Sequence, residues 1–211
     1  MTELILALDV RGGKEALAIA EACAPYIDRI KLGYPLVLAA GLAVAGEMAA
    51  LGRPLIADFK VADIPNTNRL IAEEVFAAGF SSLIAHAFTG SDAVAACVDV
   101  AHANGGECYV VAEMSHPGAV EFFHGGVAER LAETAVACGA DGIIAPATRP
   151  GRIARLREIV GNRAILSPGV GTQGGEMERV APLVDGVIVG RSIYEAPDPA
   201  AAAAAYAALR R

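Results

Sequence analysis

The sequence predicts an α/β protein, a single (β/α)₈ barrel of the TIM type whose one domain spans residues 1–211. Eight short apolar runs alternate with longer segments of helical periodicity from end to end. The runs are continuously apolar, as expected for strands covered by helices on one face and by a packed interior on the other. With 211 residues, the chain has room for eight such units and little more.

Each strand is followed by a helix. We expect strands over residues 4–9, 29–33, 54–60, 82–86, 108–113, 142–146, 164–167 and 186–189. We expect helices over residues 35–51, 65–78, 92–104, 150–160, 176–183 and 198–210, and two more that end near residues 24 and 138. Glycines that suit helix ends precede the next strand at Gly52, Gly79, Gly105, Gly139 and Gly161. An open doubly wound sheet is the alternative, and the count of eight strands favours the barrel.

Composition restricts the class of partner. The net charge of −7 disfavours general binding to nucleic acid or to an anionic membrane, so an anionic substrate would need local positive charge. The four cysteines have no zinc-site spacing, and reduced thiols are expected rather than a disulfide framework. The first residues do not resemble a signal peptide, and the longest uncharged apolar stretch, residues 33–46, is shorter than a membrane span. We expect a cytoplasmic protein.

Charged residues gather at the predicted carboxyl ends of the strands, where barrels of this kind place their active sites. Asp9 ends the first strand, Lys31 lies on the second, and Asp58 and Lys60 lie on the third, with Asp63 just beyond. Asp58 and Lys60 are two residues apart and therefore project to the same face of their strand. The sequence predicts a network of alternating lysines and carboxylates, and an ion-pair cluster that only fixes the barrel rim is the alternative.

A glycine-rich segment over residues 167–175 and the pair Gly190-Arg191 follow the last two strands. Glycines let backbone N–H groups approach a phosphate, and arginine binds it through paired hydrogen bonds. Barrels often bind phosphate in these two loops, so we expect a phosphate site, although tight turns alone also explain the glycines.

The histidines and serines indicate less. The four histidines have no metal-ligand spacing, and His86 is expected to be a hydrogen-bonded structural group at a strand end. Ser115 and His116 are adjacent, but a nucleophilic serine also needs an orienting third group, so hydrolase chemistry is disfavoured.

The chain resembles a known family at these same residues. Residues 58–68, DFKVADIPNTN, resemble the signature of orotidine 5′-monophosphate decarboxylases of the short archaeal or bacterial type. Residues 6–9, 31–35, 114–118, 167–175 and 189–192 resemble further motifs of that family in the same order.

The resemblance implies a carboxy-lyase that converts orotidine 5′-monophosphate to uridine 5′-monophosphate in de novo pyrimidine biosynthesis, without metal or organic cofactor. It implies a catalytic network in which Lys60 protonates the C6 carbanion: Lys31, Asp58, Lys60 and Asp63. The substrate-binding residues that it implies are Asp9, Thr67, Ser115, Pro168, Gln173, Gly190 and Arg191. It also implies a homodimer in which Asp63 and Thr67 complete the neighbouring subunit's site.

Two other functions remain open. Sugar-phosphate decarboxylases of the same superfamily, such as 3-keto-L-gulonate 6-phosphate decarboxylase, share an Asp-x-Lys-x-x-Asp pattern but use magnesium. Lys31 disfavours that function, because a lysine at this position repels a divalent cation. A non-catalytic barrel that binds nucleotides or regulates a partner is the second alternative, and it would not need an alternating network of charges.

Overall fold

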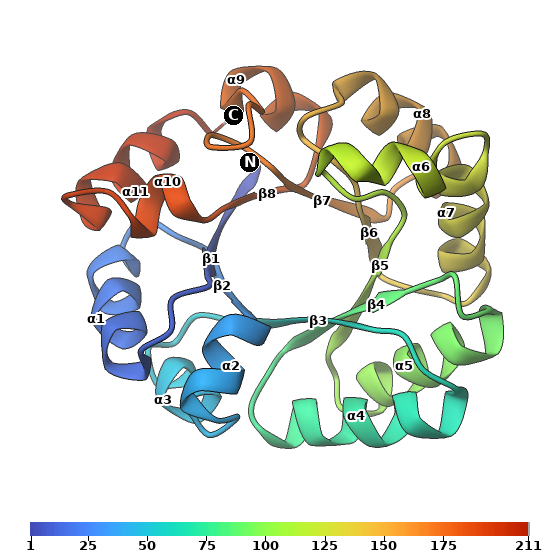
Figure 1. Ribbon diagram of the computed structural model, residues 1–211, viewed down its shortest axis with the longest axis horizontal. Helices are drawn as coiled ribbons and strands as arrows, with labels where there is room; N and C mark the ends of the chain where they lie inside the picture. The colour runs from blue at the N-terminus through green and yellow to red at the C-terminus, as the bar shows by residue number, and fades with distance from the viewer. Residues whose placement is uncertain (211) are drawn as a thin grey trace.

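Eight parallel strands form a closed barrel in the computed structural model, which describes residues 1–210. The strands are β1 (Glu3–Leu8), β2 (Arg29–Gly33), β3 (Leu55–Val61), β4 (Ser82–His86), β5 (Glu107–Val111), β6 (Gly142–Ile144), β7 (Ala164–Pro168) and β8 (Gly186–Val189). Each strand pairs with the next along the chain, and β8 pairs with β1 to close the ring (Figure 1). The predicted barrel is confirmed.

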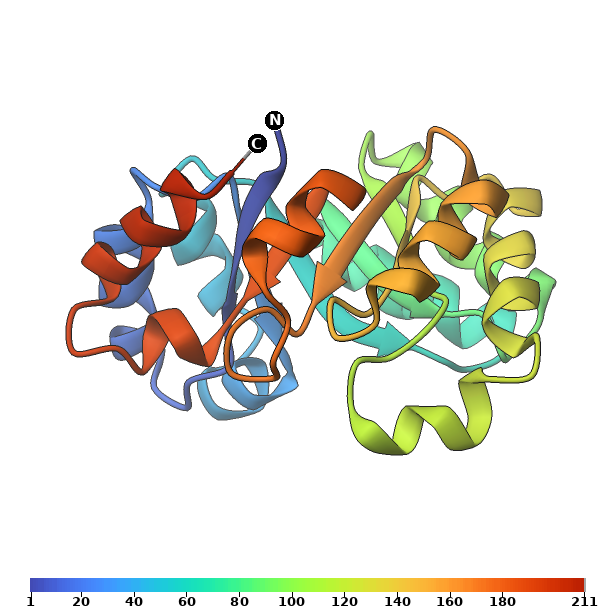
Figure 2. The ribbon, with the colours of Figure 1, turned by 90° about the horizontal axis from the view of Figure 1, so that it is seen from above.

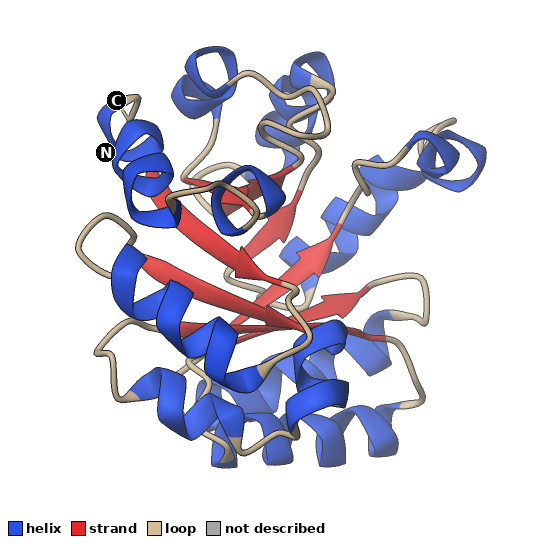
Figure 3. Cartoon of the chain, turned by 60° about the vertical axis from the view of Figure 1, so that its left-hand side comes forward, coloured by secondary structure: helices blue, strands red, loops and turns tan. Residues whose placement is uncertain are grey.

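Helices surround the ring of strands (Figure 3). They are α1 (Gly13–Cys23), α2 (Tyr34–Ala40), α3 (Val44–Ala49), α4 (Pro65–Ala77), α5 (Ser91–Ala103), α6 (Val120–Phe123), α7 (Val127–Ala137), α8 (Pro150–Val160), α9 (Met177–Val180), α10 (Arg191–Tyr194) and α11 (Pro199–Ala208). Two 3₁₀ turns complete them, η1 (Pro117–Ala119) and η2 (Ala181–Leu183). No helix within residues 1–210 is both long and apolar enough to cross a membrane.

Three predicted segments were wrong in detail. The helix expected over residues 35–51 is two helices, because Gly41 has a φ of +82° that a right-handed helix does not allow. The helix expected over residues 176–183 is the short α9 followed by η2. Between β5 and α7, where no separate helix was expected, the chain forms η1 and α6.

Alternation along the strands divides the core into two layers. On β1, Leu4, Leu6 and Leu8 pack against the helices, whereas Ile5 and Ala7 point into the barrel. The inner layer is apolar and buried: Ile5, Ala7, Ile56, Ile84, Tyr109, Val111, Ile144, Leu166 and Ile188. The barrel is therefore a packed core whose open end lies beyond this layer.

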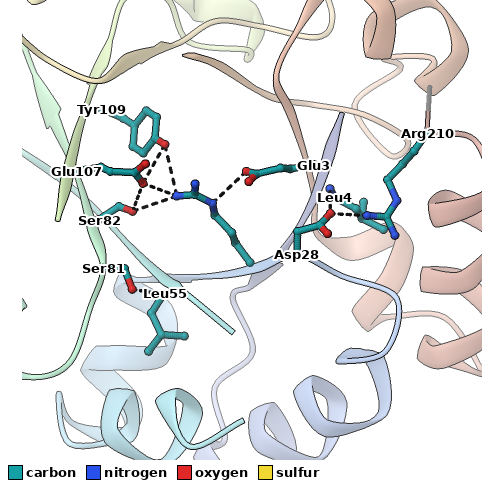
Figure 4. A network of polar contacts seen from close by, with 10 residues as sticks. Glu3, Leu4, Asp28, Leu55, Ser81, Ser82, Glu107, Tyr109 and Arg210 are labelled. Carbon is teal, nitrogen blue, oxygen red and sulfur yellow. Dashed lines mark hydrogen bonds and ion pairs between the residues drawn. The ribbon is translucent and has the colours of Figure 1, made fainter. Parts of the chain in front are cut away.

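A polar network ties the strands together at the amino-terminal end of the barrel (Figure 4). Arg29 forms ion pairs with Glu3, at 3.0 Å, and with Glu107. Ser82 Oγ and the Tyr109 hydroxyl each donate to Glu107 at 3.1 Å. These contacts join β1, β2, β4 and β5, as expected for the end of a barrel that confers stability.

Candidate active site

A pocket of about 400 Å³ opens at the carboxyl ends of the strands. It is lined by nine of the eleven predicted site residues: Asp9, Lys31, Asp58, Lys60, Ser115, Pro168, Gln173, Gly190 and Arg191. The remaining two predicted residues, Asp63 and Thr67, do not line it. The structure therefore brings residues from six strands or the loops that follow them into one site.

Strand β3 supplies two of the charged side chains. Phe59 packs outward, with its ring stacked on Tyr34 at 5.2 Å between centroids and edge-on to Phe80 at 5.7 Å. Asp58 and Lys60 therefore face the pocket, as the alternation of the strand predicts. Lys60 has a φ of +45°, the only positive value among the described residues other than glycine. The register of β3 against β4 shifts at this point, which redirects the end of the strand.

Asp58 lies between the two lysines. Its Oδ2 accepts a hydrogen bond from Lys31 Nζ at 2.5 Å, and its Oδ1 accepts one from Lys60 Nζ at 2.6 Å. Burial would raise the pKa of Asp58, but Lys31 and Lys60 outweigh it and lower the pKa to about 2. Burial likewise opposes the charge of Lys31, and Asp58 and Asp9 overcome it, so the pKa of Lys31 is raised. Asp58 and Lys31 are therefore both ionised at neutral pH.

Replacing Asp58 with Asn should reduce the dependence of stability on acid pH. The folded pKa of Asp58, about 2, lies below its ordinary value of 3.8. The carboxylate therefore contributes stability that is fully present above about pH 4 and is lost as the pH falls through 2, in total roughly 2 kcal/mol. Urea unfolding of both proteins from pH 5 to pH 2 measures this contribution. Parallel pH profiles for wild type and Asp58→Asn would contradict the pKa assignment.

The loops after β7 and β8 form the other end of the pocket. Gly169 and Gly171 have φ values of +100° and +78°, and the loop closes on itself where Gly175 N donates to Gly169 O at 2.9 Å. Ser192 Oγ accepts from Thr172 N at 2.9 Å and so links the two loops. Gln173 in this loop and Arg191 after β8 both line the pocket, which places an amide and a guanidinium at this end.

The loop after β5 meets the glycine-rich loop at Gly169. A Cβ atom built at Gly169 would lie 3.2 Å from Ser115 Cβ and 3.3 Å from Gln173 Oε1. A side chain at this position would separate the two loops. Glycine therefore permits a close approach that places Ser115 and Gln173 on adjacent walls of one pocket.

Asp63 and Thr67 lie at the start of α4, outside the pocket. Asp63 is exposed, and its backbone N–H donates to Asn68 Oδ1 at 2.9 Å. The fully buried Asn68 in turn donates to Ala93 O at 3.0 Å, which holds this turn against α5. The neighbouring Ile64 side chain is 65% exposed. Asp63 is thus presented to solvent on a well-fixed turn rather than to the lysines of its own chain.

Several residues that line the pocket were not predicted. Met114, His116, Thr172 and Tyr194 contribute polar or flexible side chains. Tyr194 lies three residues after Arg191 on α10, and this helical spacing was the available signal. The inner-layer residues Ile84, Val111, Ile144 and Ile188 form the apolar floor beside Asp58.

His86 differs from expectation. It is 9% exposed, its ring contacts Phe88 at 4.9 Å between centroids, and its Nδ1 has no hydrogen-bond partner within residues 1–210. The prediction of a hydrogen-bonded structural histidine was therefore wrong for this nitrogen. Burial, and next the charge of Lys60, lower its pKa to about 4, so the imidazole is neutral at neutral pH.

Residues 2–206 match the family model described as "Orotidine 5'-phosphate decarboxylase / HUMPS family". The chain belongs to this family. The resemblance seen at residues 58–68 is confirmed, and it extends over nearly the whole sequence.

Curated relatives are named orotidine 5′-phosphate decarboxylase, the first of the two names in the description of the family. A protein from Methanococcoides burtonii named orotidine 5′-phosphate decarboxylase is 55% identical over 202 residues, which cover 95% of this chain and 93% of the relative. A relative of the same name from Thermococcus kodakarensis is 47% identical, with 96% of this chain and 93% of the relative covered.

Solved structures of the family have the same fold. Orotidine 5′-monophosphate decarboxylase from Methanocaldococcus jannaschii, complexed with the inhibitor BMP, matches with a TM-score of 0.95 and 43% identity. This match covers 99% of the present chain and 98% of the other. The orotidine 5′-phosphate decarboxylase from Pyrococcus horikoshii matches with a TM-score of 0.90 and 43% identity over 98% of both chains.

Proposed function

We propose that this protein decarboxylates orotidine 5′-monophosphate to uridine 5′-monophosphate, a step of de novo pyrimidine biosynthesis. The observation that carries the proposal is the hydrogen-bonded Lys31–Asp58–Lys60 network in a pocket that also contains Arg191 and Gln173. The names of the family and of relatives up to 55% identical support the same reaction. So does the inhibitor complex of the M. jannaschii structure.

The charges suit the chemistry of this decarboxylation. The bond between C6 and the carboxylate breaks, CO₂ leaves, and the electron pair stays on C6, where no adjacent carbonyl delocalises it. We assign to Lys60 the stabilisation of this carbanion and its protonation, with the proton restored to the amine by solvent. Asp58 disfavours the substrate carboxylate placed beside it, and Lys31 keeps Asp58 ionised and oriented. Fixed charges of this kind provide electrostatic preorganisation.

The rest of the pocket would bind the parts of the substrate that do not react. Arg191, Gln173 and the Gly190 backbone are assigned to the phosphate, and Pro168 lies at the same end of the pocket. Ser115 is assigned to the pyrimidine, and Asp9 to the ribose hydroxyls. Binding of the remote phosphate can favour closure of the glycine-rich loop, so that its binding energy contributes at the transition state.

A homodimer is part of the proposal. Asp63 and Thr67 would enter the partner subunit's site, Asp63 beside the lysines and Thr67 at the ribose. Their positions outside the pocket of their own chain support this arrangement. Exposed apolar side chains occur on the elements around them: Tyr34, Leu38, Ile64, Leu70 and Phe88. Such side chains favour burial against a second copy of the chain.

Mixing two inactive variants tests the shared site. Lys60→Ala and Asp63→Ala proteins should each be nearly inactive, and together they should regain about a quarter of wild-type activity after exchange of subunits. Half of the dimers formed at random are mixed, and each mixed dimer has one intact site. The assay is UMP formation after the two proteins have been unfolded and refolded together. Activity no greater than that of the separate variants would exclude sharing of Asp63.

The proposed function is tested by the loss of orotidine 5′-monophosphate absorbance with purified protein and a chelator. Rapid conversion to uridine 5′-monophosphate would establish the reaction and show that no removable metal is needed. Failure to convert it, with magnesium-dependent turnover of a sugar phosphate, would favour a sugar-phosphate decarboxylase of the same superfamily. Tight binding of the product without turnover would favour a binding protein.

We also propose that the enzyme acts in the cytoplasm and that nucleic acid and membranes are not its partners. The absence of any disulfide among the four cysteines of the described chain favours a reducing compartment. The net charge of −7 disfavours nucleic acid and anionic membranes.

A further inference from the structure

Glu113 is a fully buried carboxylate directly before the pocket residues Met114 and Ser115. Its Oε1 accepts from Arg149 Nε at 2.7 Å, and its Oε2 accepts from Arg152 Nε at 2.8 Å. A buried charge costs free energy unless its partners are well placed, and this one has a guanidinium on each oxygen. None of the proposed chemical steps uses this group.

The same network holds the backbone of the pocket loop. Arg149, besides binding Glu113, donates from Nη2 to the carbonyl oxygen of Met114. Thr148 Oγ1 donates to the carbonyl oxygen of Ser115 at 3.2 Å. Two consecutive carbonyls of the loop after β5 are thus fixed by the segment that leads into α8. Because Arg149 binds both Glu113 and Met114, a change at Glu113 is transmitted to the loop.

The carboxyl-terminal end of the 114–126 segment lies close to the same network of Glu113, Arg149 and Arg152. Arg152 Nη1 and Nη2 donate to the two oxygens of Glu129 on α7, at 2.9 and 3.0 Å. His124 Nε2 lies 3.6 Å from Glu113 Oε1. The 114–126 segment therefore begins next to Glu113 and ends close to it again. Between these points the segment carries η1 and α6, which projects from the barrel on the side away from both termini (Figure 2).

We propose that Glu113 is a positioning residue that holds the 114–126 segment in place and thereby sets recognition of the pyrimidine ring. Glu113 itself does not line the pocket, so it acts through Ser115. The phosphate end of the pocket belongs to other loops, after β7 and β8. Loss of Glu113 should therefore weaken the contact with the base and leave the contact of Arg191 with the phosphate largely unchanged. This inference rests on the proposed function, because it takes a pyrimidine nucleotide as the ligand.

Calorimetric titration of Glu113→Gln with two ligands tests the inference. Uridine 5′-monophosphate probes both ends of the pocket, whereas ribose 5-phosphate probes only the phosphate and ribose. We expect the Kd of uridine 5′-monophosphate to rise about tenfold or more, the size of a coupling between contacting residues. The Kd of ribose 5-phosphate should stay within about twofold. An equal loss for both ligands, or for neither, would overturn the positioning role.

Glu107→Gln is the matched control. It removes a carboxylate from the polar network at the opposite end of the barrel, where Glu107 forms an ion pair with Arg29 (Figure 4). We expect a lower melting temperature and an unchanged ratio of the two Kd values. If Glu107→Gln changes this ratio as much as Glu113→Gln does, general loosening of the barrel explains the result and the inference fails. A wild-type protein that binds neither ligand would instead contradict the proposed function.

A double-mutant cycle separates positioning from stability. If Glu113 acts through Ser115, its replacement should have little further effect on uridine 5′-monophosphate binding once Ser115 is Ala. Additive effects would show that Glu113 acts elsewhere. Glu129→Gln removes the carboxylate that forms an ion pair with Arg152. Because Glu129 is less buried than Glu113, it provides a second variant if Glu113→Gln does not fold. It should shift the same Kd ratio in the same direction, and an unchanged ratio would count against the proposal.

Discussion

Replacement of Lys60 by Ala is expected to lower turnover of orotidine 5′-monophosphate by about 10⁴-fold or more, with the barrel intact. A preorganised charge contributes about 10²–10³-fold and a positioned proton donor about 10²–10⁴-fold, and Lys60 is assigned both roles. Its ammonium lies 2.6 Å from Asp58 Oδ1 in the pocket, and its side chain is about one third exposed, so substrate can reach it. Initial rates at saturating substrate measure the effect.

Lys14 provides the control for this variant, because the chain has only three lysines and the other two line the pocket. Lys14 is exposed on α1, and Lys14→Ala should keep the wild-type rate. Circular dichroism and the melting temperature establish that Lys60→Ala is folded. Turnover within tenfold of wild type in a folded Lys60→Ala protein would show that another group donates the proton.

Replacement of Arg191 by Ala is expected to lower kcat/KM by about 100-fold or more, mainly through a higher KM. A charge-assisted hydrogen bond contributes about 1.5–3 kcal/mol, and a guanidinium can form two such bonds to one phosphate. Arg191 begins α10 directly after β8 and lines the pocket with Gln173. Steady-state kinetics over a wide range of substrate concentration separate KM from kcat.

Orotidine, which lacks the phosphate, shows whether the loss is specific. Its slow decarboxylation should be nearly equal in wild type and Arg191→Ala, because the lost contact is to a group that orotidine does not have. Arg179→Ala on the neighbouring α9 removes an exposed arginine, and its kinetics should match wild type. If Arg191→Ala slows both substrates equally, the phosphate assignment is wrong.

Periodicity in the sequence predicted the barrel because each strand is a complete apolar run between helices. It also predicted that Asp58 and Lys60 share a face, since alternation on a strand fixes side-chain direction without knowledge of the neighbours. The pocket followed from the rule that the carboxyl ends of barrel strands converge. These predictions depend on local pattern and topology, and both are encoded along the chain.

Features that depend on contacts between distant residues were not predicted. Glu113 was read only as the end of a strand, because its partners Arg149 and Arg152 lie more than thirty positions later. The unpartnered Nδ1 of His86 is a property of packing, for which composition gives no signal. The break at Gly41 was missed because the residues on both sides continue a helical pattern. The placement of Asp63 outside its own pocket depends on the turn that Asn68 fixes.

The left-handed backbone at Lys60 lowers the stability of the fold at a residue that the proposed mechanism uses. A residue with a side chain costs roughly 1–2 kcal/mol in this region of φ, and glycine does not bear that cost. Exchange of Lys60 for glycine would relieve this cost but would also remove the ion pair with Asp58, so a laboratory selection for heat resistance alone would have little reason to keep the lysine. The same selection with growth on pyrimidine-free medium would retain the lysine. The chain therefore carries a strained backbone at the residue to which the proposed mechanism assigns proton transfer.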